Sequence, residues 1–313
     1  MQIIPNRPIH IFPLFNLSTF LRRAVADRRK RSRRSSSAQS PTAATRLANG
    51  GAVSADVTSA NTVGYVTSQV ANGYYKTFSV TLTDVANPAA PVRVDKLFTI
   101  DTIKNVTAWG DSMDQIWRWD TTGNQWVKYG YQKPRSGGTA AWRKCNYETD
   151  KSFSDLTDAD AVQPGETFLY YRGGDATATL TLSGQVKELG QPAGYTIANG
   201  FYQFIAYPWP VALKLSDVMN LATFSTIKTV TAWGDSMDQI WRWDAVGNQW
   251  LKYGYQKPRS GGTAAWRKCN YETDKSFSEL TDADKIEAGE GFLYYRGGDE
   301  TLTLTWKPLQ SAE

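Results

Sequence analysis

The sequence predicts an all-β, mainly antiparallel protein with a few short helices, and three observations favour this class. Aromatic and β-branched residues alternate with small or polar ones in segments such as 71–82 and 178–186. Clusters of Gly, Asn and Asp separate these segments, as turns separate strands. The same pattern then occurs a second time along the chain. We therefore expect two homologous β-sandwich or barrel-like domains in tandem, after a disordered N-terminal leader.

The leader comprises residues 1–55 and differs in composition from the rest of the chain. Its apolar start is interrupted by Pro5, Pro8 and Pro13, and the basic block 22–34 follows. A secretory signal has the opposite order, with positive charge before the apolar stretch. We expect a disordered segment. A translation start assigned upstream of the true one, an unusual export segment and a polyanion-binding arm remain alternatives.

Charge separates this leader from the body of the protein. The 313-residue chain has a formal net charge of +5, but residues 1–50 hold ten basic residues and one acidic residue. The remainder therefore carries 25 basic and 29 acidic residues, and its charge gives no reason to expect nucleic-acid binding. The sequence contains no apolar run of about 18 residues, so we expect no membrane span.

An internal repeat dominates the body of the chain. Residues 103–175 align without gaps with residues 227–299, and only ten of the 73 aligned positions differ. A weaker echo lies upstream, where Gly64-Tyr65 and residues 70–75 resemble Gly194-Tyr195 and residues 197–202. A unit of this length predicts complete domains with their own cores. We place them at residues 60–188 and 192–307 and expect both to have one fold.

Two hairpins are expected in each repeat. In the first, the aromatic-rich arms of "DQIWRWDTTGNQWVKYGY" flank a turn at residues 121–124. In the second, "ETFLYYRGGDATATLTLSGQV" turns about residues 173–175. Helical spacing of apolar residues is confined to short segments, which are 94–101, 153–162 and 215–224, the last with Ser216 as a cap.

The order of these motifs resembles a known kind of module. A Gly-Tyr opening strand is followed by "ANGYY", "WRWD…NQWVKY", "PGETFLYYRGG" and a closing "TLTLSGQV". This set is similar to uncharacterised β-rich modules found singly or in tandem in secreted and surface bacterial proteins of the verrucomicrobial and lentisphaeral type. The resemblance covers residues 60–307. It implies an exported β protein and supplies no catalytic residues.

Aromatic residues are the main candidates for a binding site. Ten of the 12 tryptophans occur as equivalent pairs in the two repeats. Exposed rings flanked by Asp and Arg can stack on sugars, whereas buried rings form a core or a protein contact. All three roles are open from the sequence. The candidate binding residues for a glycan or a protein are Trp117, Trp119, Trp126, Tyr129, Trp241, Trp243, Trp250 and Tyr253.

Other reactive residue types point to structural roles. Repeated carboxylates, such as Asp111, Asp114 and Asp120, suit turns and caps better than an EF-hand or a glycosidase pair. Each repeat has one cysteine, Cys145 or Cys269, and no histidine in the body could serve as its base. A short linker between similarly oriented repeats favours relation by translation, with both thiols free. A bridge between the repeats or between chains is the alternative. We expect no cofactor and no metal.

These observations favour a non-catalytic, secreted or envelope-associated structural or interaction protein. Near-identical tandem repeats present the same surface twice, which suits assembly or avidity. Its expected partners are a second copy of the chain, another envelope protein or a polysaccharide. A carbohydrate-binding tandem that uses the duplicated Trp and Tyr surfaces is the alternative, and a glycan-active enzyme is the third candidate.

Overall fold

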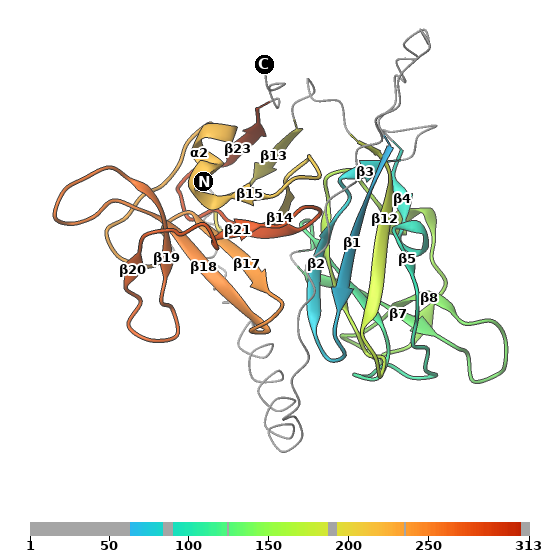
Figure 1. Cartoon of the computed structure of the whole chain (residues 1–313). Coiled ribbons are helices and arrows are strands. Elements are labelled where there is room, and N and C mark those ends of the chain that lie inside the picture. The colour runs from blue at the N-terminus through green and yellow to red at the C-terminus, as the bar shows by residue number, and fades with distance from the viewer. Residues whose placement is uncertain (1–62, 84–89, 124, 187–192, 235, 308–313) are drawn as a thin grey trace, which may run out of the picture. The chain divides into compact units, whose positions relative to one another are not determined.

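The computed structural model describes residues 63–83, 90–123, 125–186, 193–234 and 236–307 (Figure 1). The expected leader, residues 1–55, lies outside the described residues. Residues 60–313 belong to one compact unit. Antiparallel strands are the main regular structure of the described residues and helices are few and short, so the predicted all-β class is confirmed.

The first repeat contains two main sheets. A six-stranded sheet has the order β2-β11-β6-β7-β8-β9. A second sheet has the order β1-β12-β3, with β5 also paired to β12, and the short strands β4 and β10 form a separate pair. The strands are β1 (Val63–Val70), β2 (Tyr75–Ser79), β3 (Leu82–Thr83), β4 (Val92–Arg93), β5 (Thr99–Ile100), β6 (Gln115–Asp120), β7 (Gln125–Gln132), β8 (Ala141–Cys145), β9 (Phe153–Ser154), β10 (Ala161–Val162), β11 (Thr167–Tyr171) and β12 (Ala178–Val186).

The second repeat reproduces this arrangement. Its six-stranded sheet is β14-β22-β17-β18-β19-β20, its smaller sheet is β13-β23-β16, and β15 pairs with β21. Its strands are β13 (Ala193–Ile197), β14 (Tyr202–Ala206), β15 (Leu213–Lys214), β16 (Ala222–Phe224), β17 (Gln239–Asp244), β18 (Gln249–Gln256), β19 (Ala265–Cys269), β20 (Phe277–Ser278), β21 (Lys285–Ile286), β22 (Gly291–Tyr295) and β23 (Leu302–Trp306). Each strand pairing between described residues stays within one repeat.

Each repeat buries one apolar core between its two main sheets. In the first repeat, Leu180 and Leu182 of β12 belong to the same cluster as Phe168 of β11 and Ile116 of β6. Alternate residues of β12 are buried, as its sequence alternation predicts. Two sheets around a shared core are compatible with a β-sandwich. Whether 60–188 and 192–307 fold independently remains a prediction.

The expected helices are shorter than their sequence spacing indicated. Residues 94–96 form one 3-10 turn, and 215–217 form another that continues into α2 (Val218–Leu221). In segment 153–162, strand β9 precedes a 3-10 turn at Asp158–Asp160, where the Thr157 and Asp160 side chains form a capping box. Strand pairing at both ends of these segments leaves room for a single turn. Ser216 makes no cap, because its hydroxyl bonds to the carboxylate of Asp217.

One of the two predicted hairpins is correct. Strands β6 and β7 pair around the turn at 121–124, as do β17 and β18 in the second repeat. The hairpin expected around residues 173–175 is wrong. Strand β11 pairs with β2 and β6, whereas β12 pairs with β1, β3 and β5. The chain therefore crosses from one sheet to the other at this turn.

A buried ion pair holds this crossing. The guanidinium of Arg172 lies 2.6 Å from the Asp114 carboxylate, and both side chains are almost fully buried. The same guanidinium donates to the carbonyl oxygens of Ala176 and Thr102, and the amide of Gly173 donates to Asp114. Asp238 and Arg296 repeat this pair in the second repeat. Desolvation raises the pKa of Asp114, although Lys104, Arg172 and Gly173 donate to the carboxylate and favour its ionised form.

Glycine is required at the crossing because of this close packing. A side chain at Gly173 would collide with the backbone of Met113, and one at Gly174 would collide with the Arg172 guanidinium. Gly173 and Gly174 therefore leave room for Met113 and the buried Arg172 side chain, and they do not form the turn of a hairpin.

We predict that Arg172→Met destabilises the protein by about 3–5 kcal/mol, because it leaves the Asp114 carboxylate buried without its partner. Urea unfolding followed by tryptophan fluorescence measures this change. The exposed-loop variant Arg135→Met should stay within about 0.5 kcal/mol of the wild type. Equal stabilities of the two variants would contradict a structural role for the buried pair.

Candidate functional site

Two of the candidate tryptophans, Trp119 and Trp243, lie where the two repeats contact each other. Trp119 Nε1 donates to the backbone oxygen of Tyr202 at 3.1 Å, and Trp243 Nε1 donates to that of Tyr75 at 2.8 Å. Trp119 and Trp243 are equivalent, and the strand registers make Tyr75 and Tyr202 equivalent as well. Each repeat thus gives the same donor to the same acceptor of the other.

Reciprocal contacts of this kind correct the expectation that translation relates the repeats. A translated pair would join two different faces, whereas here the same face is used on both sides, as in an isologous dimer. The physical reason is that each Trp N–H finds a backbone acceptor across the contact, where it is sheltered from water.

Six of the eight predicted binding residues are buried, and Trp126 and Trp250 are half-buried. Rings contact one another within and across the repeats. The Tyr75 centroid lies 5.5 Å from that of Trp117 in its own repeat and 5.7 Å from that of Trp243 in the other, and Trp126 lies 5.6 Å from Phe204 of the other repeat. Tyr129 and Tyr253 instead point to Asp160 and Asp284 within their own repeats. The structure therefore places most of these rings against protein.

The contact between the repeats departs from symmetry at its centre. Gly291 is the equivalent of Thr167, and a side chain built at Gly291 would collide with Thr167. The Thr167 hydroxyl lies 2.7 Å from that of Ser79 and completes a buried hydrogen bond. The space between β11 and β22 thus holds the side chain of one repeat, and glycine is required opposite it.

A second departure involves Tyr195. On one side, the Ser79 amide donates directly to the Gly289 carbonyl at 2.9 Å. On the other side, the Tyr195 hydroxyl separates the equivalent groups: it accepts from the Ala206 amide and donates to the Gly165 carbonyl. The register of β1 and β13 places Ser68 at the position of Tyr195. The proposed match of Gly64-Tyr65 with Gly194-Tyr195 is therefore wrong by three residues.

A third departure changes the ion pairs beside the contact. In the first repeat, Arg118 donates twice to Glu166, at 2.9 and 3.1 Å. In the second repeat, Lys76 reaches across from β2 and pairs with Glu290, the equivalent of Glu166. Arg242 then donates to the Ala283 carbonyl, and its buried Nε has no hydrogen-bond partner among the residues that the structure describes. The residue equivalent to Lys76 is Gln203, which is neutral.

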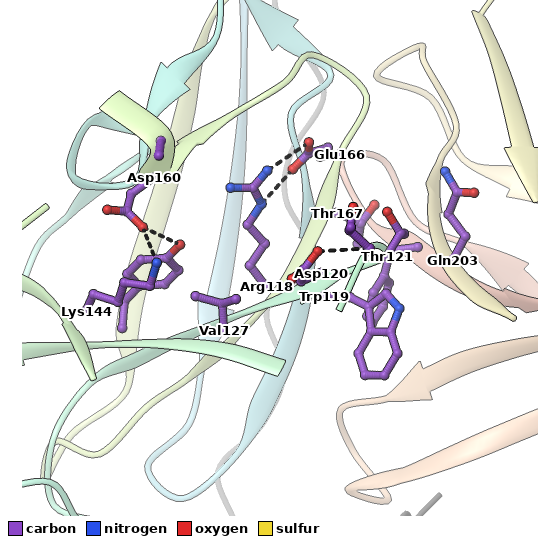
Figure 2. A pocket seen from close by; sticks show the side chains of 14 residues that line it. Arg118, Trp119, Asp120, Thr121, Val127, Lys144, Asp160, Glu166, Thr167 and Gln203 are labelled. Atoms are coloured by element: carbon purple, nitrogen blue, oxygen red, sulfur yellow. Dashed lines mark hydrogen bonds and ion pairs between the residues drawn. The ribbon is translucent and has the colours of Figure 1, made fainter. Parts of the chain in front are cut away.

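A cleft of about 370 Å³ lies beside Arg118 in the first repeat (Figure 2). Figure 2 shows the Arg118–Glu166 pair between the Lys144–Asp160 pair and the indole of Trp119, with Gln203 approaching from the second repeat. The cleft is lined by Arg118, Trp119, Asp120, Thr121, Thr122, Val127, Tyr129, Lys144, Ala159, Asp160, Glu166, Thr167, Gln203 and Phe204. Two of the predicted residues, Trp119 and Tyr129, contribute to it.

The cleft presents fixed donors and acceptors. Lys144 and Tyr129 both reach Asp160 at 3.2 Å. Burial raises the pKa of Asp160, but hydrogen bonds from Thr157 and Lys144 outweigh burial and keep the pKa below its usual value. Burial and the Asp160 charge raise the pKa of the Tyr129 hydroxyl, so it remains a neutral donor. Arg118 and Glu166 keep 22% and 32% of their side-chain surface exposed and can face a ligand.

Trp117 and Trp241 contribute to a different feature, a buried lysine between two rings. The Lys128 ammonium lies 4.4 Å from the Trp117 ring centre and 3.0 Å from that of Tyr147. Lys252 repeats the arrangement with Trp241 and Tyr271. Burial lowers the pKa of both lysines to about 8, although the rings favour the cation.

The remaining candidate groups have structural positions. Cys145 and Cys269 are buried and unbridged, and burial raises the pKa of each thiol to about 11. Asp120 and Asp150 accept backbone N–H groups in turns. Within the described residues, no three His, Cys, Asp or Glu side chains are placed to hold a metal ion.

Sequence analysis missed Lys76, Gln203 and Phe204, which lie outside the nearly identical segment. The signal that could have found them is a difference in charge or size at equivalent positions, since Lys76 corresponds to Gln203 and Thr77 to Phe204. No model of a protein family matches the chain, and the searches of curated proteins and of solved structures gave no significant match.

We predict that Gly291→Thr destabilises the protein by about 1–3 kcal/mol, because two threonines then compete for one space. Thr167→Gly loses the hydrogen bond to Ser79 in the wild type, but it should cost clearly less in the Gly291→Thr background, where it also relieves the collision. A double-mutant cycle by urea unfolding should give a coupling energy of at least about 1 kcal/mol. Additive effects would mean that the two positions do not meet.

We also predict that two lysine side chains titrate near pH 8, and that Lys128→Met and Lys252→Met each remove one of them. Lysine-selective NMR measures this directly. The folded pKa of each lysine lies below its ordinary value of 10.5, so the unfolded chain binds more protons between pH 8 and 10.5. The unfavourable contribution of each lysine is therefore complete below about pH 8 and disappears as the pH rises to 10.5. The absence of any lysine titration below pH 9.5 would contradict the burial of these amines.

Proposed function

We propose that the protein is a non-catalytic interaction protein, secreted or associated with the cell envelope, that presents two copies of one binding surface. The reciprocal Trp119 and Trp243 hydrogen bonds carry this proposal, because they hold the two repeats together by their aromatic faces. Surfaces away from this contact stay exposed in both copies. No helix in the described part of the chain is long and apolar enough to cross a membrane.

The loops that follow β7 and β18 are the best candidates for the presented surface. Residues 133–140 and 257–264 have the same sequence, "KPRSGGTA". Lys133, Arg135, Lys257 and Arg259 are all exposed there. By contrast, five of the ten differences between the aligned segments fall within residues 161–167, which lead to the contact between the repeats. Two identical basic loops on one chain favour an acidic partner that is bound at two points.

We predict that Arg135→Glu and Arg259→Glu each reduce retention of the protein on the insoluble envelope fraction of the producing cells. The double variant should lose more, on the order of 100-fold, because the second contact of a bivalent binder acts at high local concentration. Lys96→Glu, the same charge change at another exposed site, is the control. Retention of the double variant at the wild-type level would overturn the proposal, and release of soluble saccharides from the envelope would favour an enzyme.

Carbohydrate binding is the second candidate, and the cleft beside Trp119 favours it. The cleft brings Arg, Lys, Glu, Asp and Gln side chains together next to Trp119 and Phe204. Polar side chains of this kind orient sugar hydroxyls. This form of the candidate differs from stacking on exposed, duplicated rings, because six of the eight predicted rings are buried.

A further inference from the structure

We propose that the cleft beside Arg118 binds one neutral saccharide of one or two rings, and that each chain has a single such site, in the first repeat. The proposal rests on the carbohydrate-binding candidate and specifies its ligand and stoichiometry. The observation behind it is the difference between Gln203 and Lys76, which occupy equivalent positions at the two ends of the contact between the repeats.

The chemistry of the cleft matches a neutral polyhydroxyl ligand. Its volume of about 370 Å³ is within the range of small-ligand pockets. Its lining holds three carboxylates, Asp120, Asp160 and Glu166, against two cations, so the charge balance disfavours an anion. A hydroxyl group both donates and accepts hydrogen bonds, and it can therefore use the guanidinium, the carboxylates and the Gln203 amide together.

The arrangement of these groups is preorganised. The paired hydrogen bonds between Arg118 and Glu166 hold both planar groups in one orientation. Hydrogen bonds from Tyr129 and Thr157 hold Asp160, the partner of Lys144. A saccharide would then meet side chains that lose little further freedom on binding, which favours affinity.

The equivalent place in the second repeat is built differently. Lys76 extends into this place and forms an ion pair with Glu290. Arg242 therefore donates to the Ala283 carbonyl and does not pair with a carboxylate as Arg118 does. Thr77 stands at the position that corresponds to Phe204. An ammonium group in place of the Gln203 amide removes the pair of planar groups that the first cleft has. The near-identity of the repeats therefore does not produce two sites.

Saturation-transfer NMR on the full chain tests the proposal. The probes are methyl glucosides, galactosides, mannosides and N-acetylglucosaminides, with cellobiose, maltose and chitobiose. We expect at least one to bind, and calorimetry to give one site per chain. Gln203→Lys should weaken binding by at least about tenfold, because the new ammonium competes for Glu166 as Lys76 does for Glu290. The fold should tolerate this change, since lysine already occupies the equivalent position.

Matched variants separate the outcomes. Gln69→Lys adds the same charge at an exposed position of β1 and should bind as the wild type does. Lys76→Gln should leave the first site unchanged. If no saccharide binds the wild type, both the carbohydrate-binding candidate and this site are wrong. If Gln203→Lys binds as well as Gln69→Lys, or if the wild type binds two saccharides, the candidate stands but the single cleft is overturned. A far-ultraviolet spectrum and melting curve for each variant exclude loss of fold.

Discussion

The structure depends on one constraint: two nearly identical surfaces face each other, and positions at the centre of their contact meet their own equivalents. A side chain there must share its space with the same side chain from the other repeat. Thr167 and Gly291 show the solution, since one position keeps its side chain and the other gives it up. Tyr195 is a second solution of the same kind. Its hydroxyl lies between the Ala206 amide and the Gly165 carbonyl, whereas the equivalent Ser79 amide and Gly289 carbonyl bond directly.

Away from the centre of the contact, the same interaction can form on both sides at little cost in free energy, and the two repeats keep it. Trp119 and Trp243 each donate to a backbone carbonyl, and a backbone acceptor is present whatever side chain the opposite strand carries. The contact can therefore tolerate the replacement of Thr77 by Phe204 without losing its hydrogen bonds. Side chains next to the tryptophans, such as Lys76 and Gln203, are free to differ, and the surroundings of Arg118 and Arg242 acquire different chemistry from nearly the same framework.

The sequence predicts local features well and long-range ones poorly. The hairpin at 121–124 could be predicted because its turn and its aromatic arms are adjacent in the chain. The hairpin at 173–175 was wrong because Arg172 is held by Asp114, 58 residues away, which diverts the chain into another sheet. Likewise, the Trp119 ring could be identified as special, but its burial depends on Tyr202 of the other repeat, and no pattern within one repeat reveals that contact.

Joining the two repeats in one chain is what allows this asymmetry. In a homodimer with an isologous contact, every position has the same residue in both subunits, so a threonine at position 167 would meet another threonine. In one chain each half can change separately, and Gly291 can accommodate Thr167. For the same reason, one of two equivalent positions can hold the neutral Gln203, beside which Arg118 and Glu166 stay paired, and the other can hold Lys76, which pairs with Glu290. Identical exposed loops and different surroundings for Arg118 and Arg242 are therefore compatible, because only the residues near the contact must differ for the two halves to fit.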